Sequence, residues 1–416
     1  MPDHHNPLLL LTTGLFAGAL LAIAIQRLKP KPRKEDIRSG IEECIGNTPL
    51  IRIKSLSNAT GCEILGKAEF LEPGGSIKDR VALNIIKTAE GQGLLRPYSG
   101  DVVYEGTVGS TGVSLAMLCR ARGYLAHICM PNDQSLEKSS LLLKLGAALT
   151  TTSPAPIVSP THFVNLARTL STTHPTLPSS TPSSHGYFAN QFETPYNFAA
   201  HYTTTGPEIF SQCGGRLSAF VSGAGTGGTL SGVAAYLKSQ DPKIKIVLAD
   251  PQGSGLYNKI KHGVLFSPTE KEGTRRRSQV DTIVEGIGLN RLTHNFSLGR
   301  PLISDAIRVS DEEALAMARF LVEKDGLFLG SSSAVNCFAA VKLAMELGPG
   351  HRIVTILCDS GTRHLSKFWK GMEVGASWDM EIGDVLGASK IRRFSDGARH
   401  NREQVPAGLK NEEFAA

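Results

Sequence analysis

The sequence predicts an α/β fold, because short apolar strands are followed by glycine-rich turns and then by helices. Two stretches show this order: 101–104 before the turn 105–112 and a helix at 113–122, and 217–221 before the turn 223–228 and a helix at 230–237; a third strand, 353–357, precedes a turn at 358–361. Apolar runs of this kind are typical of buried strands, and in open α/β sheets ligands bind at the carboxyl ends of the strands. The 416 residues have room for two or three domain-sized units.

The composition is that of an ordinary globular protein, with 41% hydrophobic and 20% charged residues. Much of the excess behind the net charge of +6 lies in two short basic runs, residues 27–34 and 275–277, so it gives little reason to expect a nucleic acid partner. The seven cysteines are scattered, without a Cys-x-x-Cys pair or a Cys/His cluster at metal-ligand spacing. This pattern indicates a reducing compartment and predicts no metal site.

Residues 8–25 form an uncharged, mainly apolar run that just meets the length of a membrane span. Asp3 precedes the run and the basic residues 27–34 follow it, so the positive-inside rule keeps the rest of the chain in the cytosol. We therefore predict a transmembrane anchor and basic linker in residues 1–34. A cleaved signal peptide, which Ala22 and Ala24 would also suit, and a mitochondrial presequence are less favoured.

The stretch EPGGSIKDR, residues 72–80, places Lys78 after a Gly-Gly-Ser turn and before a helix predicted over residues 79–89. Amide donors at a helix start and a low-dielectric pocket would lower the pKa of this lysine, as a Schiff-base lysine requires. Taken alone, these nine residues favour an exposed Lys-Asp-Arg run at a helix start. The other motifs of the chain reverse that preference.

Five motifs resemble those of the pyridoxal-phosphate enzymes of the cysteine synthase and cystathionine β-synthase family, fold type II. They are GNTPL (46–50), the lysine motif PGGSIKDR (73–80), EGTVGSTG (105–112), SGAGTGGT (222–229) and CDSGTR (358–363), in the family's order. The match spans roughly residues 41–375 and is most similar to the membrane-anchored fungal mitochondrial members. It implies two α/β subdomains with open twisted sheets and the cofactor between them, about 72–195 and about 41–71 with 196–378. A polar tail, 379–416, is expected after the catalytic region 35–378.

The resemblance implies how pyridoxal 5'-phosphate would be held. Lys78 is expected to form the Schiff base and to be the catalytic residue. The phosphate is expected to be bound by Gly225, Thr226, Gly227, Gly228 and Thr229. Ser360 is expected to meet the pyridine nitrogen, with Asp359 as the rival candidate. A hydroxyl at that place makes the ring a shallower electron sink than a carboxylate would, which suits elimination of a β-substituent.

The substrate's α-carboxylate is expected, by the same resemblance, at Thr107, Gly109, Ser110, Thr111 and Gln191. Amides at a helix start and nearby hydroxyls are donors that bind anions. Ser110 is a departure, because the family usually has an asparagine there that hydrogen-bonds the cofactor's ring oxygen. The shorter serine would weaken this contact or leave it to a water molecule. The EGIG segment, 285–288, resembles the family's flexible glycine segment beside the substrate.

The second glycine loop has a competing interpretation. GAGTGG (223–228) follows a predicted strand, and Asp250 ends the next strand 22 residues after Gly228, where a ribose-binding acid would lie. Alone, this arrangement would predict an NAD-dependent dehydrogenase. Only a loop that binds a single phosphate explains Lys78, the 105–112 motif and Ser360 together, so we favour pyridoxal phosphate.

Three other stretches carry weaker expectations. Residues 150–184, rich in Ser, Thr and Pro, are expected to form a long surface excursion with one helix at 162–170 and no part in the chemistry. Residues 266–277 are expected to be an exposed basic loop. Ser331 to Ser333 open a helix that they are expected to cap.

The function implied by the resemblance is that of a cysteine synthase, which replaces the β-substituent of O-acetylserine or serine by sulfide. Lys78 would remove the Cα proton before acetate or water leaves. Cystathionine formation from serine and homocysteine, or serine/threonine deamination, is the alternative on the same fold. A catalytically weak, membrane-tethered scaffold is the alternative of another class.

The expected partners are the amino-acid substrate, sulfide, a membrane through residues 8–25, and a second copy of the chain in a homodimer. A moderately apolar span with a basic cytosolic flank resembles the signal anchors of the mitochondrial outer membrane. We therefore expect the anchor in that membrane, with the catalytic part facing the cytosol. The endoplasmic reticulum membrane is the alternative.

Overall fold

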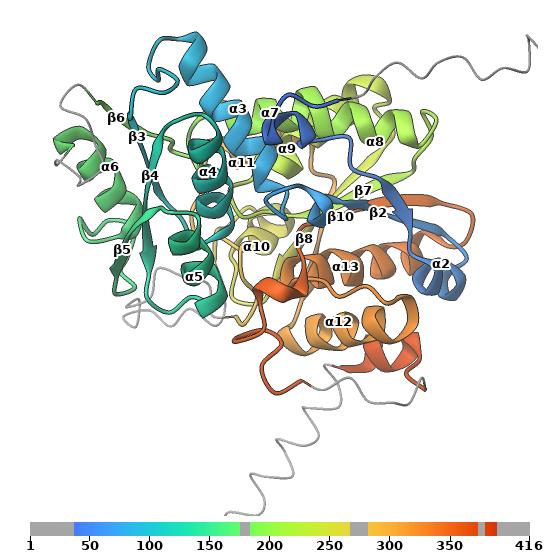
Figure 1. Cartoon of the computed structure of the whole chain (residues 1–416). Coiled ribbons are helices and arrows are strands. Elements are labelled where there is room, and N and C mark those ends of the chain that lie inside the picture. Colours follow the sequence, from blue (N-terminus) through green and yellow to red (C-terminus); the bar gives the residue numbers. More distant parts are fainter. Residues whose placement is uncertain (1–36, 175–183, 267–281, 373–378, 389–416) are drawn as a thin grey trace, which may run out of the picture. The chain divides into compact units, whose positions relative to one another are not determined.

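The computed structural model describes residues 37–174, 184–266, 282–372 and 379–388. Two sheets organise residue 40 onward (Figure 1). The smaller sheet is parallel, and its strand order is β5 (Ala148–Thr152), β4 (Leu125–Pro131), β3 (Val102–Gly106) and β6 (Gly186–Phe188). The larger sheet has the order β1 (Leu50–Arg52), β2 (Glu63–Ala68), β10 (Arg352–Leu357), β7 (Ala219–Gly223), β8 (Lys245–Pro251) and β9 (Asp305–Val309). Its β1–β2 pair is antiparallel, and the other pairs are parallel.

The labelled α-helices are α2 (Lys54–Thr60), α3 (Lys78–Gly91), α4 (Ser110–Ala121), α5 (Leu136–Lys144), α6 (Phe163–Thr173), α7 (Pro195–Ala200), α8 (Gly206–Gln212), α9 (Gly228–Gln240), α10 (Leu256–His262), α11 (His294–Gly299), α12 (Asp311–Asp325) and α13 (Ser331–Leu347), and residues 382–388 are helical as well. Short 3-10 segments are η1 (Ile41–Cys44), η2 (Glu69–Leu71), η4 (Arg300–Leu302) and η5 (Gly361–Arg363), and η3 (His201–Thr205) is a π-helix.

The smaller sheet is covered on both faces. Helices α3, α4 and α5 bury Ile85, Leu115 and Leu142 against one face, in a core shared with Val103 and Ile128 of the strands. Helix α6 covers the other face through its own buried side chains. Because both faces are covered, the central strands β3 and β4 are almost entirely buried, as is typical of parallel sheets.

The larger sheet separates two cores. Alternate residues of β7 point to opposite faces, so that Val221 packs in the core of Phe338 from α13 while Phe220 packs in the core of Leu230 from α9. Figure 1 shows α12 and α13 on one side of this sheet and α8 and α9 on the other. Turns at the carboxyl ends of β7 and β10 are therefore held by strands buried on both faces.

The predicted α/β class is confirmed, and both sheets are parallel apart from the edge strand β1. The predicted strand-turn-helix units correspond to β3 with α4 and β7 with α9. Within the described residues, no helix is long and apolar enough to cross a membrane. The anchor predicted at residues 8–25 lies outside the described residues, as does most of the basic loop 266–277.

Residues 150–184 are more than the surface excursion expected from their composition. The predicted helix is present as α6, but Phe163, Val164 and Ala167 are buried on the smaller sheet, and residues before and within α6 form one wall of the cavity described below. A composition rich in serine, threonine and proline predicts a loop, but it does not show which residues of that loop are buried. Val385, in the segment 379–388 assigned to the polar tail, is likewise fully buried in the core beside α12 and α13.

Candidate active site

A cavity of about 550 Å³ lies where loops from the carboxyl ends of strands of both sheets meet. The turn after β3 contributes Thr107 and Ser110, the turn after β7 contributes Gly225, and the turn after β10 contributes Asp359. A concave site of this size with a few convergent polar groups is typical of small-molecule sites, and its position follows the rule for open α/β sheets.

Lys78 is the first residue of α3 and lines this cavity. Burial lowers the pKa of its amine, although the charge of Asp359 acts in the opposite direction. Lys78 therefore loses its proton at a lower pH, closer to neutral, than an exposed lysine does. A buried amine with this property can act as a nucleophile toward a carbonyl or as a base.

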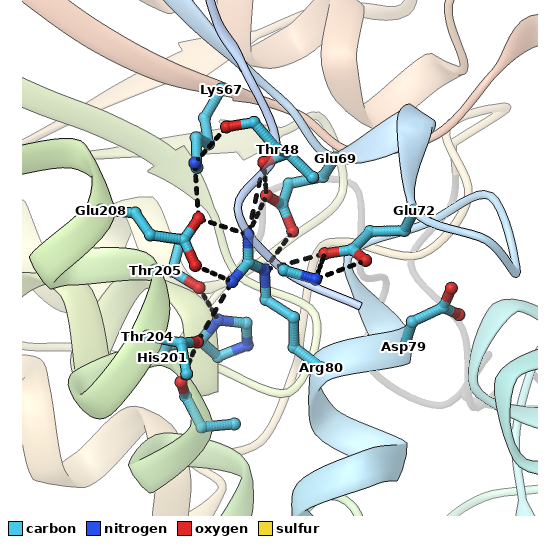
Figure 2. A network of polar contacts seen from close by, with 12 residues as sticks. Thr48, Lys67, Glu69, Glu72, Asp79, Arg80, His201, Thr204, Thr205 and Glu208 are labelled. Carbon is cyan, nitrogen blue, oxygen red and sulfur yellow. Dashed lines mark hydrogen bonds and ion pairs between the residues drawn. The ribbon is translucent and has the colours of Figure 1, made fainter. Parts of the chain in front are cut away.

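Arg80, two residues further along α3, is buried in an ionic network (Figure 2). Its Nε and Nη2 donate to Glu69 at 2.7 and 2.9 Å, and its Nη1 and Nη2 donate to Glu208 of α8 at 2.7 and 2.8 Å. Glu72 Oε1 lies 3.0 Å from Nε, and Lys67 Nζ on β2 donates to Glu208 Oε2 at 2.6 Å. The network fixes the first turn of α3, and therefore Lys78, to η2 and α8. The exposed Lys-Asp-Arg run that these residues alone would favour is excluded.

The charges of this network are nearly balanced. Burial and the neighbouring Glu69 raise the pKa of Glu72 to about 8, so that it is mostly protonated at neutral pH. Burial would also raise the pKa of Glu208, but hydrogen bonds from Arg80 and Lys67 lower it to about 2. Two cations therefore face two carboxylates, the arrangement in which a buried ionic cluster is tolerated.

Asp79 points away from this network in Figure 2 and links α3 to α4 instead. Ser114 Oγ on α4 donates to Asp79 Oδ1, and the amide of Gly74 donates to Oδ2. Ser114 Oγ is also 3.1 Å from the carbonyl oxygen of Ser110. The helix that carries Lys78 is thus hydrogen-bonded to the helix that begins at Ser110.

The turn between β7 and α9, called the cradle below, comprises Gly225 to Thr229 and leads directly into the start of a helix. A Cβ on Gly225 would lie 2.0 Å from the Gly286 carbonyl oxygen. Gly227 has φ +88°, and a Cβ there would lie 2.5 Å from Cα of Phe296. Thr226 Oγ1 accepts a hydrogen bond from Asn197 Nδ2 at 2.8 Å, which leaves its own proton available to an anion. Amides at the start of a thirteen-residue helix complete the set of donors.

Thr229 completes the cradle on the first turn of α9. Its Oγ1 lies 3.1 Å from Nε2 of His201, which is fully buried in the π-helix η3. Burial, together with the charges of Lys78 and Arg80, lowers the pKa of His201 well below its ordinary value, so the imidazole is neutral. The threonine hydroxyl is therefore supported by a group that adds no charge to the cradle.

The loop after β3 contributes a second group of polar side chains to the cavity. Thr111 Oγ1 donates to Gln191 Oε1 at 2.6 Å, and the Gln191 amide reaches Glu105 at 3.4 Å and the Gly106 carbonyl at 3.3 Å. Both Thr111 and Gln191 line the cavity. Gln191 is therefore held in place by protein partners on both sides of its amide.

The cavity brings together most of the residues predicted for the site. Those that line it are Lys78, Thr107, Ser110, Thr111, Gln191, Gly225, Thr226, Gly227 and Thr229. Gly109, Gly228 and Ser360 are not among its lining residues. Ser360 Oγ accepts hydrogen bonds from the amide and hydroxyl of Thr362, at 3.3 and 3.1 Å, whereas the rival Asp359 does line the cavity.

Asp250, the candidate ribose-binding acid of the dinucleotide interpretation, does not line the cavity. It is fully buried and its Oδ2 accepts the amide hydrogen of Tyr257 at 2.7 Å, at the start of α10. Burial raises its pKa to about 7. Asp250 thus supports the chain between β8 and α10 and offers no carboxylate to a ligand in the cavity.

Ser331 and Ser333 do not cap α13 as expected. Gly330 is the N-cap and makes no side-chain capping bond. Ser331 Oγ accepts the amide hydrogen of Glu285 at 3.0 Å, and Ser333 Oγ accepts that of Cys358 at 2.8 Å. The serines therefore fix two cavity-lining segments to the start of α13, a long-range role that helix patterns do not reveal.

The cavity contains functional groups that the sequence did not single out. Lys138 of α5, Glu285 and His364 line one part of it, and His162 and Phe163 another. Of these, only Glu285 carried a signal, as part of the glycine segment 285–288. His162 is the N-cap of α6, and its Nδ1 accepts the amide hydrogen of Val164 at 3.2 Å.

Comparison with known proteins adds three findings. A profile of the family "Pyridoxal-phosphate dependent enzyme" matches residues 41–359. Cysteine synthase 2 of Emericella nidulans is 57% identical over 94% of this chain and its own entire length. A Saccharomyces cerevisiae protein provisionally described as a mitochondrial cysteine synthase is 54% identical over 82% of this chain and 85% of its own.

A solved structure is similar as well. The O-acetylserine dependent cystathionine beta-synthase from Helicobacter pylori matches with a TM-score of 0.66 and 32% identity, over 80% of this chain and 99% of that one.

Proposed function

The chain belongs to the pyridoxal-phosphate dependent enzyme family, and on this premise we propose that it is a cysteine synthase that replaces the β-substituent of O-acetylserine or serine by sulfide. The observation that carries the proposal is the position of Lys78, whose amine of lowered pKa lines a cavity between a phosphate cradle and a loop of anion-binding donors. The names of the relatives support cysteine as the product.

The residues present fit pyridoxal 5'-phosphate. In the cradle of Gly225 to Thr229, amides at the start of α9 and the proton of Thr226 Oγ1 would hold the phosphate. Lys78 would hold the cofactor covalently, and Ser360, with Asp359 as the alternative, would meet its ring nitrogen. When bound, the cofactor supplies an electron sink for the charge that develops at the substrate's Cα.

The side chains of the cavity then have distinct tasks. Thr107, Ser110 and Thr111 hold the α-carboxylate, with Gln191 beside them, and so orient the Cα–H bond. Lys78 removes the Cα proton, for which a lysine of lowered pKa is suited near neutral pH. Acetate or water then leaves from Cβ, and sulfide adds there to give cysteine.

Product analysis with two acceptors tests this proposal. The protein is incubated with O-acetylserine, or with serine, and either sulfide or homocysteine, and the products are separated by chromatography. Cysteine as the main product is the expected result. Cystathionine as the main product, or ammonia without an acceptor, would replace the proposed reaction with one of its alternatives. Absence of any product from a protein loaded with cofactor would favour the scaffold.

We further propose that residues 8–25 anchor the protein in the mitochondrial outer membrane with the catalytic part in the cytosol, as a homodimer. The name of the Saccharomyces cerevisiae relative supports the organelle. A variant without residues 1–34 is expected to be soluble and active, and sedimentation of this variant measures its oligomeric state. Protease added to intact mitochondria is expected to degrade the catalytic part. Protection until the outer membrane is opened would contradict this topology.

A further inference from the structure

Four charged side chains form a buried network on the cavity wall, and only Asp359 among them has a place in the proposed function, as the alternative partner of the ring nitrogen. His364 Nδ1 lies 3.0 Å from Glu285 Oε2, and His364 Nε2 lies 3.0 Å from Asp359 Oδ2. Lys138 Nζ donates to Glu285 Oε2 at 2.8 Å. The exposed fractions are 1% for His364, 3% for Lys138 and 5% for each of the two acids, and all four residues line the cavity.

The geometry specifies the protonation state of His364. Each ring nitrogen faces a carboxylate oxygen, but a neutral imidazole carries only one N–H and would turn a lone pair toward one of the acids. Burial favours the neutral ring, yet the charge and hydrogen bond of Asp359 and the hydrogen bond of Glu285 outweigh it and raise the pKa of His364. Burial would raise the pKa of Glu285, but the hydrogen bond from His364 and the charge of Lys138 lower it. The proton therefore resides on the ring, and two charge-assisted hydrogen bonds form.

Two glycines, Gly330 and Gly109, leave space for the side chains of the network. A Cβ on Gly330 would lie 2.0 Å from Asp359 Oδ1 and 2.6 Å from His364 Nε2. A Cβ on Gly109 would lie 2.4 Å from Cδ of Lys138. Gly109 belongs to the loop of anion-binding donors, so the Lys138 stem packs directly on that loop. The network thus joins the segments that contribute Lys138, Glu285 and His364.

Other charges face the same group from neighbouring segments. Lys367 Nζ lies 3.5 Å from Glu285 Oε1 and is about one-third exposed. The charge of Arg363 acts on Asp359 and lowers its pKa further, after His364 and Lys138, against the effect of burial. Within the buried set, the cations of Lys138 and His364 equal the anions of Glu285 and Asp359.

We propose that His364, as an imidazolium, is a positioning residue that holds Glu285 and Asp359 on the cavity wall and balances their charge, so that the cavity admits anionic reactants. Without the ring's charge, two carboxylates would face the amino acid's carboxylate and the hydrosulfide ion, with Lys138 as the buried cation that offsets them and Lys367 and Arg363 beside it. Repulsion of this kind weakens binding of both reactants more than it slows bond breaking. The inference rests on the proposed function, because that function defines which reactants enter.

The variant His364→Gln keeps an amide donor and removes the charge. We expect the KM for sulfide and for O-acetylserine to rise about tenfold, which is the effect of losing one charge roughly 12 Å from the ligand's charge at an effective dielectric constant of roughly 20. The kcat is expected to change less than about threefold, because the loss acts mainly on binding. His351→Gln is the matched control, since His351 lies outside the cavity and bonds Ser218 at 3.1 Å. Unchanged KM values in a folded His364→Gln would overturn the proposed role.

A second measurement needs no variant and no turnover. Hydrogen exchange at imidazole C2, followed by mass spectrometry across pH, gives the pKa of individual histidines in the unaltered protein. We expect a value for His364 above about 6.5, the value of an unperturbed histidine. A value at or below it means a neutral ring and overturns the proposal. If the protein makes no cysteine, the proposed function is refuted, but the measured pKa of His364 still tests whether its ring is charged.

Discussion

Arg80 and Glu208 are joined by two parallel hydrogen bonds, Nη1 to Oε1 at 2.7 Å and Nη2 to Oε2 at 2.8 Å, across 128 residues of sequence. Arg80 lies on α3, which covers the smaller sheet, and Glu208 lies on α8, on the side of the larger one. Bidentate pairing of this kind fixes orientation as well as distance. Because Lys78 begins the same helix, the pair ties the reactive amine to both halves of the cavity.

Arg80→Met is therefore expected to be strongly destabilising. It leaves Glu69 and Glu208 buried without their main cation, and removal of one partner from a buried ionic group costs about 3–5 kcal/mol. Urea denaturation measures the change in the free energy of unfolding. Lys261→Met is the control, because Lys261 and Asp305 are both more than one-third exposed in their ion pair, and exposed pairs contribute at most about 1 kcal/mol. Equal, small losses in the two variants would show that the Arg80 network does not stabilise the fold.

Lys78→Ala is expected to abolish activity and covalent attachment of the cofactor without unfolding the protein. Borohydride reduction of the unaltered protein, followed by peptide mass spectrometry, is expected to find the pyridoxyl group on Lys78. Lys87→Ala, an exposed site on the same helix, is the control and is expected to retain both activity and attachment. A pyridoxyl group on any other lysine would refute the assignment.

The predicted site residues that the structure brings together at the cavity lie in contiguous motifs. Lys78 and the cradle at Gly225 each lie in a short run in which local chemistry limits the conformation, since a glycine turn before a helix has few alternatives. Strands buried on both faces were predicted for the same reason, because continuous apolar residues of this length are rarely exposed.

The remaining features depend on pairing at long range. His364 and Glu285 are 79 residues apart, and nothing near either residue indicates the other. The residues next to Arg80 in the sequence suggested an exposed charge. Its acidic partners are Glu69 of η2, Glu72 of the lysine motif and Glu208 of α8, and they surround Arg80 only in the folded chain. Composition likewise identified 150–184 as loop-rich, but could not show that residues such as Ile157 face the cavity.

Glu105 is expected to make the protein less stable as pH rises. Burial raises its pKa to about 8, against the opposing hydrogen bonds of Gln191. The unfolded chain loses this proton near pH 4.3, so between that pH and 8 the folded state binds more protons and stability falls with pH, by up to about 1.4 kcal/mol per unit. Glu105→Gln removes this contribution, which urea denaturation at pH 5.5 to 8 would detect. The exposed Glu346→Gln is expected to keep the slope of the unaltered protein. Identical slopes with and without Glu105 would mean that it is ionised in the fold.

The last prediction concerns Ser110, which begins α4 and lines the cavity where the resembled family usually has asparagine. The helix fixes the position of its backbone, while its side chain is short. If the hydroxyl leaves the contact to the cofactor's ring oxygen loose, Ser110→Asn restores one hydrogen bond, and turnover with O-acetylserine is expected to rise by up to about tenfold. Steady-state kinetics measure this, with the exposed Ser239→Asn as control. An unchanged or lower rate would show that the cavity is built around serine, and that the departure from the family defines the site.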